Sequence, residues 1–235
     1  MICLGTIVNV ITVIVGGTLG LILKKFLAKR ITDTIMQGVG LAVIIIGVSG
    51  ALSALGDHIL LMIISLAVGA LIGELLRIED RLESFGKFME SKFVKQSDVS
   101  TSTFAQGFVT AALVFCVGSM AIVGSIEDGI NGNSTILFAK SALDGISAMI
   151  FASTLGIGVL FSAAAVGIYQ GSITMLAIFI APYLNDTVVT QMSLIGSVLI
   201  MAIGFNMLGM AKIKVGNLLP AIFVPVVYYV VGLIV

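Results

Sequence analysis

The sequence predicts an all-α membrane protein, a polytopic transmembrane helix bundle of about eight spans in one integral-membrane domain that covers residues 1–235. Mean hydropathy is +1.21, with 59% apolar and 10% charged residues, whereas a soluble domain has about 45–50% apolar residues and about a quarter charged. Apolar runs of about 20 residues, the length that crosses a hydrocarbon core of about 30 Å, recur along the chain. Lys and Arg gather in alternate connections between these runs, as expected for cytoplasmic loops.

The expected spans are the apolar runs between polar turns. In chain order they are Ile2–Leu23, Thr34–Ser53, Ile59–Leu76, Phe104–Val123, Thr135–Leu155, Ile157–Leu184, Val188–Met210 and Leu218–Val235. The first run lacks a basic start and is too long for the apolar segment of a signal peptide, so we expect it to remain as a transmembrane helix. The tight turn that separates the fifth and sixth spans is expected at Thr154–Gly156.

Two spans carry signs of irregular backbone. The sixth run has 28 residues, or about 42 Å of helix, which is too long for an upright helix. It either tilts or is interrupted near Tyr169–Ser172, where a break would expose backbone groups to a cavity. In the last span, Asn217, Pro220 and Pro225 predict a kinked start, because proline removes a backbone hydrogen-bond donor.

The charged residues predict the orientation. Eleven of the twelve basic residues lie in three connections: Lys24, Lys25, Lys29 and Arg30; Arg77, Arg81, Lys87, Lys92 and Lys95; and Lys212 and Lys214. The opposite connections carry no Lys or Arg but hold Asp57, Glu127, Asp128 and Asp186. The positive-inside rule therefore predicts a multi-pass protein of the cell (plasma) membrane with both termini outside.

The long connection after the third span predicts a cytoplasmic interfacial amphipathic helix over residues 77–94. Its apolar residues recur at helical spacing with charges between them, and Glu83 and Lys87 form a favourable i,i+4 pair. Such a helix lies on the surface of the bilayer. It serves either as an anchor or as a docking site for a partner.

Lys140 and Asp144 are the main candidates for an ion- or substrate-binding site. They lie one helical turn apart within the fifth span, where ionisable side chains are costly and usually face a bundle interior or an aqueous path. In the functional interpretation, Asp144 binds a proton or cation and Lys140 is its counter-ion or an anchor for an anionic substrate. In the structural interpretation, the pair is a neutral packing device, with Lys140 extending outward and Asp144 bonded to neighbouring serines.

Other polar residues within the spans extend this prediction. The further candidates for ion or substrate binding are Ser147, Ser119, Gln170, Asn9 and Asn206. Hydroxyl and amide side chains in lipid seek hydrogen-bond partners, so these residues are expected to face protein. Glu127 and Asp128, beside a glycine at the outer end of the fourth span, form either a cation-collecting entrance or a solvated loop.

The sequence argues against several functional classes. The only histidine, His58, lies in a predicted outer turn, so no Ser–His pair and no HExxH zinc motif occurs within the membrane. Only Asp144 lies deep in a span, whereas an aspartyl protease needs two carboxylates. There is no nucleotide-binding P-loop, and the formal net charge of zero gives no basic surplus for nucleic acid. We therefore expect no enzymatic activity, no cofactor, no metal and no nucleic-acid partner.

The chain resembles an uncharacterised family of prokaryotic membrane proteins, the "domain of unknown function 554" or YqgA/YdfK-like family. The segments that carry the resemblance are Gly5–Asn9, Gln37–Ala42, Phe115–Gly129, Ala139–Ser147, Ala152–Gly158, Tyr169–Ser172 and Lys212–Pro220. The runs Gly-Ser-Ile-Glu-Asp-Gly and Lys-Ser-x-x-Asp-Gly are the more specific ones. The resemblance implies a single integral-membrane domain of prokaryotic type and supplies no substrate.

Taken together, these patterns favour a membrane transporter or channel for an ion or small solute, coupled to protons or cations through Asp144. The alternative is a non-transporting membrane scaffold or sensor that acts through the cytoplasmic amphipathic helix. The expected partners are the lipid bilayer and a small ion or solute, and the sequence is compatible with a homo-oligomer.

Overall fold

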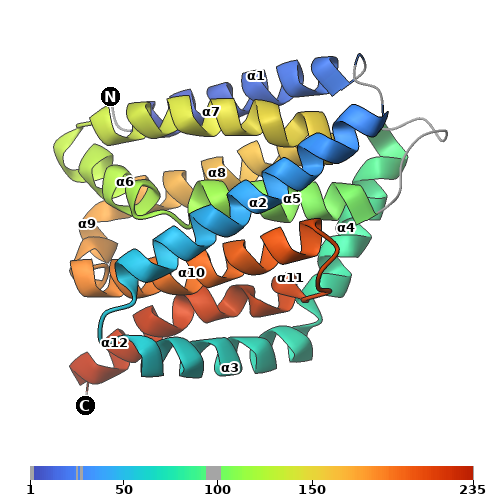
Figure 1. Cartoon of the computed structure of the whole chain (residues 1–235). Helices are drawn as coiled ribbons and strands as arrows, with labels where there is room; N and C mark the ends of the chain where they lie inside the picture. The colour runs from blue at the N-terminus through green and yellow to red at the C-terminus, as the bar shows by residue number, and fades with distance from the viewer. Residues whose placement is uncertain (1–2, 25, 27–28, 94–101, 235) are drawn as a thin grey trace.

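The structure, a computed structural model, describes residues 3–24, 26, 29–93 and 102–234. These residues form an all-α bundle without strands, which confirms the predicted fold class (Figure 1). Ile2 and Val235, the outer limits of the first and last predicted spans, lie outside the described residues, as do Lys25, Val94 and Lys95.

The first half of the described chain forms six helices. They are α1 (Leu4–Lys24), α2 (Lys29–Ala54), α3 (Ile59–Leu76), α4 (Ile78–Phe93), α5 (Ser102–Cys116) and α6 (Ser119–Asn131). The second half contains α7 (Thr135–Leu155), α8 (Gly158–Met175), α9 (Ala177–Ile180), the 3-10 helix η1 (Ala181–Tyr183), α10 (Asp186–Met207), α11 (Val215–Leu218), the 3-10 helix η2 (Leu219–Phe223) and α12 (Val224–Ile234).

Among the described residues, seven helical segments are long and apolar enough to cross a membrane, and the bent pair α5–α6 brings the total to eight if it counts as one span. The long helices run side by side, and the start of α1 and the end of α12 lie at the same end of the bundle (Figure 1). The expected turn between the fifth and sixth spans is present, because α7 ends at Leu155 and Gly156 adopts a positive φ of 82°.

Span four contains a break that the sequence analysis did not predict. Phe104–Cys116 and Met120–Asn131 are bent by 58° with respect to each other. Gly118, between them, is extended at φ −67° and ψ 146°. The i to i−4 hydrogen-bond ladder is therefore interrupted inside the apolar region, as in a broken or re-entrant membrane helix.

Span six is continuous at Tyr169–Ser172, where an interruption was one of the two alternatives. α8 runs through Tyr169–Ser172 and ends at Met175, and the remainder of the predicted span forms α9 and η1. The alternative of a break at that point is therefore excluded, and the excess length is taken up by a shorter helix followed by the short segments α9 and η1. The kinked start of the last span is confirmed, since α11 and η2, which contains Pro220, precede α12.

Glycines set the closest helix contacts. A Cβ atom on Gly16 would lie 2.0 Å from the backbone oxygen of Gly145, and one on Gly20 would lie 2.2 Å from that of Met149. Such distances leave no room for a side chain, so α1 and α7 touch backbone to backbone. On the other side of the molecule, Gly73 of α3 meets the Asn217 oxygen of α11 in the same way, at 1.9 Å.

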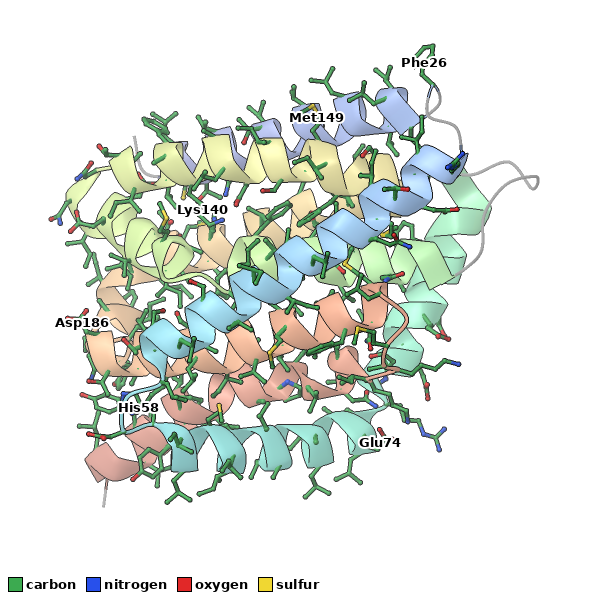
Figure 2. The ribbon with its side chains drawn as sticks, viewed as in Figure 1. Phe26, His58, Glu74, Lys140, Met149 and Asp186 are labelled. Carbon is green, nitrogen blue, oxygen red and sulfur yellow. The ribbon has the colours of Figure 1, made fainter. Side chains whose placement is uncertain are left out.

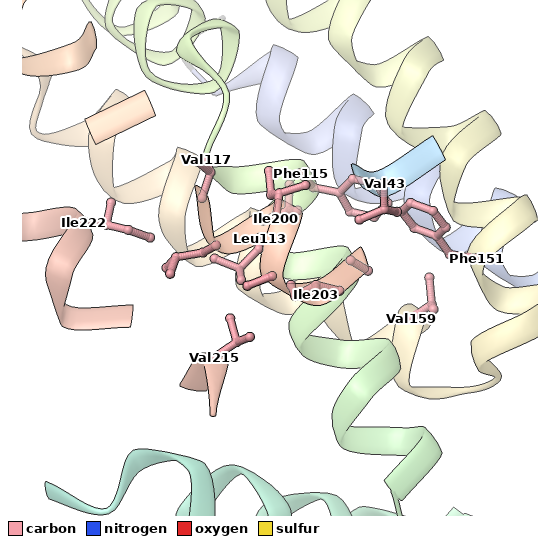
Figure 3. Packing of buried hydrophobic residues seen from close by; sticks show 14 of the residues in the cluster. Val43, Leu113, Phe115, Val117, Phe151, Val159, Ile200, Ile203, Val215 and Ile222 are labelled. Atoms are coloured by element: carbon pink, nitrogen blue, oxygen red, sulfur yellow. The ribbon is translucent and has the colours of Figure 1, made fainter. Parts of the chain in front are cut away.

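The apolar core lies where α5, α7, α8 and α10 meet. Figure 3 shows its buried side chains, among them Phe115, Phe151, Val159 and Ile200. The rings of Phe115 and Phe151 are stacked, with centroids 6.1 Å apart and an interplanar angle of 20°. Many Ile, Leu and Val side chains on α1, α2 and α3 are exposed instead, as expected for surfaces that face lipid.

The two ends of the bundle differ in charge. We call one end the basic end, because the end of α1, the start of α4 and the start of α11 bring Lys24, Arg77 and Lys214 there (Figure 1). The other is the acidic end, where Asp186 lies with His58 (Figure 2). This separation matches the partition of charge read from the sequence.

Candidate functional site

Lys140 and Asp144 form an ion pair inside the bundle. Both residues lie on α7, one turn apart, and their accessible fractions are only 5% and 6%. The Lys140 Nζ atom donates a hydrogen bond to Asp144 Oδ2. Lys140 is drawn in the interior of the molecule in Figure 2. The two charges therefore neutralise each other at a depth where an unpaired charge would be expensive.

Two buried amides from other helices complete this group. Asn9 of α1 donates from Nδ2 to Asp144 Oδ2 at 2.9 Å and to Gln170 Oε1 of α8 at 3.2 Å. Both amide residues are 0% exposed. We call Asn9, Lys140, Asp144 and Gln170 the polar quartet. It joins three helices, so the prediction that Asn9 and Gln170 face protein is confirmed.

The glycine contacts explain how α1 reaches the pair. Gly16 and Gly20 let α1 lie directly against the α7 backbone, and a Cβ on Gly145 would lie 3.2 Å from Thr12. Because the two helices are this close, the short side chain of Asn9 spans the gap to Asp144. A larger residue at these glycines would separate the helices and open the hydrogen bond.

The ammonium group of Lys140 also lies near an aromatic ring. Its Nζ atom is 6.0 Å from the centroid of Phe115, a distance at which a cation and the face of a ring attract each other. Phe115 lies in the last turn of α5, directly before the α5–α6 break. The polar quartet is therefore linked to the discontinuous helix through this contact.

Several polar atoms at and near the quartet have no hydrogen-bond partner in the described residues. They are Asn9 Oδ1, Gln170 Nε2, Thr6 Oγ1, Thr174 Oγ1 and Asp128 Oδ2. Buried polar atoms in proteins are nearly always paired, with protein or with water. Two of these atoms, Asn9 Oδ1 and Gln170 Nε2, belong to the quartet itself, so the quartet keeps hydrogen-bonding capacity that a water molecule, an ion or a polar solute could use.

These unpaired atoms extend from the quartet toward the acidic end. Thr6 lies one turn before Asn9 on α1, and Thr174 lies one turn beyond Gln170 on α8. A Cβ on Gly129 of α6 would fall 2.3 Å from the backbone oxygen of Thr174. Asp128, next in sequence to Gly129, therefore lies near the end of α8 that carries Thr174. The buried polar side chains thus form a series along α1, α6 and α8.

The two predicted entrance residues have different surroundings. Asp128 is 0% exposed and accepts a hydrogen bond from Ser134 Oγ at 2.6 Å. Glu127 is only partly buried and accepts from Asn131 Nδ2 at 3.0 Å. Asp128 is thus not a solvated loop carboxylate but part of the buried polar series.

Three other predicted site residues are not brought to the quartet. Asn206 lies at the basic end, where its amide exchanges hydrogen bonds of 2.7 and 2.8 Å with the backbone of Ile213 and closes the α10–α11 loop. The structure therefore does not bring Asn206 to the quartet. Ser147 is half-buried on α7, and its side chain makes no hydrogen bond to the quartet in the described residues. Ser119 begins α6 at the helix break, and its side chain lies outside the described part.

Thr6, Thr174 and Phe115 were not predicted from the sequence as site residues. A signal was available for the threonines, because Thr6 precedes Asn9 by three residues and Thr174 follows Gln170 by four. These spacings place each pair on one helix face. Phe115 had no such signal, because its role depends on where α5 ends. No group of three or more His, Cys, Asp or Glu side chains in the described residues could hold a metal ion.

A second charged cluster lies at the basic end and fixes the start of α11. Lys214 donates to Glu74 Oε1 at 3.0 Å, and Asn217 donates to Glu74 Oε2 at 2.5 Å. The carboxylate of Glu79 accepts from the Gly216 N–H at 2.6 Å, and the Glu79 N–H donates to Asn217 Oδ1 at 2.8 Å. These contacts tie α3 and the first turn of α4 to α11, and we call them the basic-end latch.

Two groups of the basic-end latch that lie outside the spans, Glu79 and Lys214, have raised pKa values. Burial raises the pKa of Glu79, although its hydrogen bond from Gly216 opposes that effect. The hydrogen bond and charge of Glu74 raise the pKa of Lys214. The Lys214–Glu74 pair itself is exposed, so it contributes little to stability, whereas the contact between Glu79 and the Gly216 backbone is partly buried.

Comparisons with known proteins find relatives along nearly the whole chain. The family model described as "Protein of unknown function (DUF554)" matches residues 4–230. The "Uncharacterized membrane protein YdfK" of Bacillus subtilis (strain 168) is 35% identical over 230 residues, which cover 97% of this chain and 96% of the relative. The "Uncharacterized protein YqgA" of Escherichia coli (strain K12) is 30% identical over 220 residues, 93% of each chain. No solved structure matches.

Proposed function

The chain belongs to the DUF554 family, and because that family name assigns no activity, we propose from the geometry of the polar quartet that this membrane protein is a secondary transporter or channel. It carries an ion or small solute, and the movement is coupled to a proton or cation that binds at Asp144. We propose this role in preference to an intramembrane enzyme.

One observation carries the proposal: a buried ion pair is joined through hydrogen bonds to two buried amides, each of which keeps one polar atom without a partner among the described residues. Replacing a buried ion pair by packed apolar side chains is often neutral or stabilising. Each unsatisfied polar atom costs about 1–3 kcal/mol in addition. A purely structural element would therefore gain nothing from Asn9 Oδ1 and Gln170 Nε2 without partners. A site that binds and releases a polar species needs such atoms.

The quartet supports a simple coupling step. When a proton or cation binds the Asp144 carboxylate, its charge is neutralised and the attraction that holds Lys140 is lost. Lys140 is then free to move relative to Phe115, 6.0 Å from its ammonium group, at the end of α5 beside the break at Gly118. A helix break is a place where two arrangements of nearly equal energy are possible. Ion occupancy thereby biases a conformational equilibrium.

We further propose that the protein lies in the cell membrane with its basic end in the cytoplasm. The Lys and Arg residues at that end follow the positive-inside pattern. The unpaired atoms from Thr6 to Asp128 then form an approach to Asp144 from the outside.

A sensor or scaffold that acts through α4 is the second candidate. The observation in its favour is the basic-end latch, because Glu79 in the first turn of α4 is bonded to Gly216 and Asn217 of α11. A partner that binds α4 would thereby act on the kinked last span.

The transport proposal is tested with purified protein in liposomes that contain a pH-sensitive dye. A proton or sodium gradient is imposed, and small monocarboxylates, neutral amino acids and alkali cations are supplied outside in turn. We expect the wild type to change internal pH faster than empty liposomes with at least one solute. Asp144→Asn should reduce the flux to the empty-liposome rate.

Asp57→Asn is the matched control, since Asp57 is an exposed loop carboxylate, and it should transport like the wild type. Flux through Asp144→Asn with unchanged pH dependence would contradict the proposal. So would a wild type that moves none of the solutes.

A further inference from the structure

A pocket lies between α2, α10 and the α5–α6 break, apart from the polar quartet. Its volume is about 320 Å³, enough for a small organic solute. Among the residues that line it are Gly50, Val117, Gly118, Ser193, Ser197 and Ile200. Ser53 and Gly118 are exposed, so the pocket reaches the surface. Ser53 lies in the last turn of α2 and Thr190 near the start of α10, so the pocket belongs to the acidic-end half of the bundle.

Unpaired hydroxyl groups point to a polar ligand in this pocket. Ser197 is 8% exposed and lines the pocket, and its hydroxyl makes no hydrogen bond within the described residues. The Oγ atom of Ser193, one turn earlier on α10, is buried and also lacks a partner there. Opposite them, a Cβ on Gly50 would fall 2.3 Å from Ser197 Oγ. The glycine thus keeps open the space in front of this hydroxyl.

The helix break supplies the electrostatic character of the pocket. Gly118, which lines it, is the N-cap of the 13-residue helix α6 and provides no side-chain cap. The amino end of a helix carries a partial positive charge and free N–H groups, which favour an anion. The pocket residues include no Asp, Glu, Lys or Arg. This lining can stabilise one negative charge by dipoles and hydroxyl donors, but it offers no full charge for a dianion or a cation.

We propose that this pocket binds a small organic monoanion, a short-chain monocarboxylate. The carboxylate faces Ser193, Ser197 and the start of α6, and its aliphatic part lies against Val117 and Ile200. This assignment rests on the proposed function, for which it names the substrate class. Asp144 is then the coupling site and not part of the substrate site.

The experiment measures binding directly, so that it does not depend on transport. Radiolabelled propionate is the probe, with the full-length purified protein in detergent, and unlabelled propionate, propionamide and succinate are the competitors. We expect saturable propionate binding that propionamide and succinate displace poorly. Ser197→Ala should weaken binding about tenfold or more, since a hydrogen bond to a charged group is lost. Gly50→Ala should weaken it as well, because the added methyl group occupies the pocket.

One variant serves as the control. Ser162→Ala removes a buried hydroxyl that bonds to the Val159 oxygen on α8, outside the pocket, and should bind propionate like the wild type. The pocket assignment is overturned if the wild type shows no saturable binding, if Ser197→Ala and Gly50→Ala both bind normally, or if propionamide competes as well as propionate. Failure of the transport proposal would instead appear only in the liposome assay.

Discussion

At the scale of single residues, the main feature is that one carboxylate oxygen receives two donors. Asp144 Oδ2 accepts from Lys140 on its own helix and from Asn9 on α1. The first contact follows from i,i+4 spacing, whereas the second exists only because α1 and α7 touch. The Lys140–Asp144 pair is therefore neutral overall, and Asn9 adds a further hydrogen bond to it. Either charged side chain alone would be a buried charge without a counter-ion.

This arrangement predicts a non-additive effect on stability. Lys140→Met and Asp144→Asn, made separately, should each lower the free energy of unfolding by about 3–5 kcal/mol, because each leaves one buried group unpaired. The double variant should be more stable than either single variant. Thermal unfolding of the four proteins in detergent measures this. Equal and additive losses would show that the two side chains do not interact.

At the scale of elements, interrupted and closely packed helices position the site. The α5–α6 break gives α6 a free amino end inside the membrane region. The last span begins with the short helices α11 and η2, and the basic-end latch holds the start of α11. The α1–α7 contact depends on glycines that a side chain would push apart. The α5–α6 break and the α1–α7 contact lie beside the polar quartet, and the α11–η2 start of the last span lies at the basic-end latch.

The α1–α7 contact predicts that Gly16 does not tolerate a methyl group. Gly16→Ala should destabilise the protein by about 1–3 kcal/mol, because its Cβ would lie 2.0 Å from a backbone oxygen that cannot move alone. Gly38→Ala is the matched control, since nothing lies within 4 Å of its Cβ position on α2, and it should be neutral or slightly stabilising. Melting temperatures in detergent compare the two. A Gly16→Ala protein as stable as Gly38→Ala would contradict the assignment.

The basic-end latch predicts a pH dependence of stability. Burial raises the pKa of Glu79 from its ordinary value of 4.5, so the folded protein binds this proton more tightly than the unfolded chain. Stability should therefore fall as pH rises from 4.5 through the raised pKa, and it should be regained on acidification. Glu79→Gln keeps an acceptor for the Gly216 N–H but cannot titrate. The melting temperature of the wild type should therefore fall relative to that of Glu79→Gln as pH rises. A difference that stays constant over pH would show that Glu79 does not contribute to the pH dependence of stability.

At the scale of the whole molecule, the segregation of charge gives the bundle two unlike ends. The start of α1 and the end of α12 lie at the acidic end, away from α4 and the latch (Figure 1). A bundle with both ends of its described helices on one side has crossed the membrane an even number of times. This count requires the bent pair α5–α6 to act as one crossing.

The orientation is tested with reporter fusions. Alkaline phosphatase, which is active only outside the cytoplasm, should be active when fused after Val235 and inactive when fused after Arg77. Green fluorescent protein should show the opposite pattern, because it fluoresces only when it folds inside. The reverse result at both sites would invert the proposed topology.

The sequence by itself determined the class of the fold, most of the spans and the location of the ion pair. Hydrophobic length and the positions of Lys and Arg are one-dimensional properties, because the thickness of the bilayer and its charge asymmetry act on each segment separately. The spacing of Lys140 and Asp144 is likewise local. Asn9 and Gln170 were named correctly as residues that face protein, since an amide in lipid needs a partner.

Only the tertiary structure decided which polar residues meet and where the helices break. Asn9 and Asp144 are 135 residues apart in sequence, and their contact depends on the glycines of two helices that pack against each other. Asn206 has the same side chain as Asn9, but its amide forms hydrogen bonds with the backbone of the α10–α11 loop at the basic end. The break at Gly118, in place of one near Gln170, depends on how α5 and α6 are packed by their neighbours. Such choices follow from the packing of many helices at once, which no local pattern encodes.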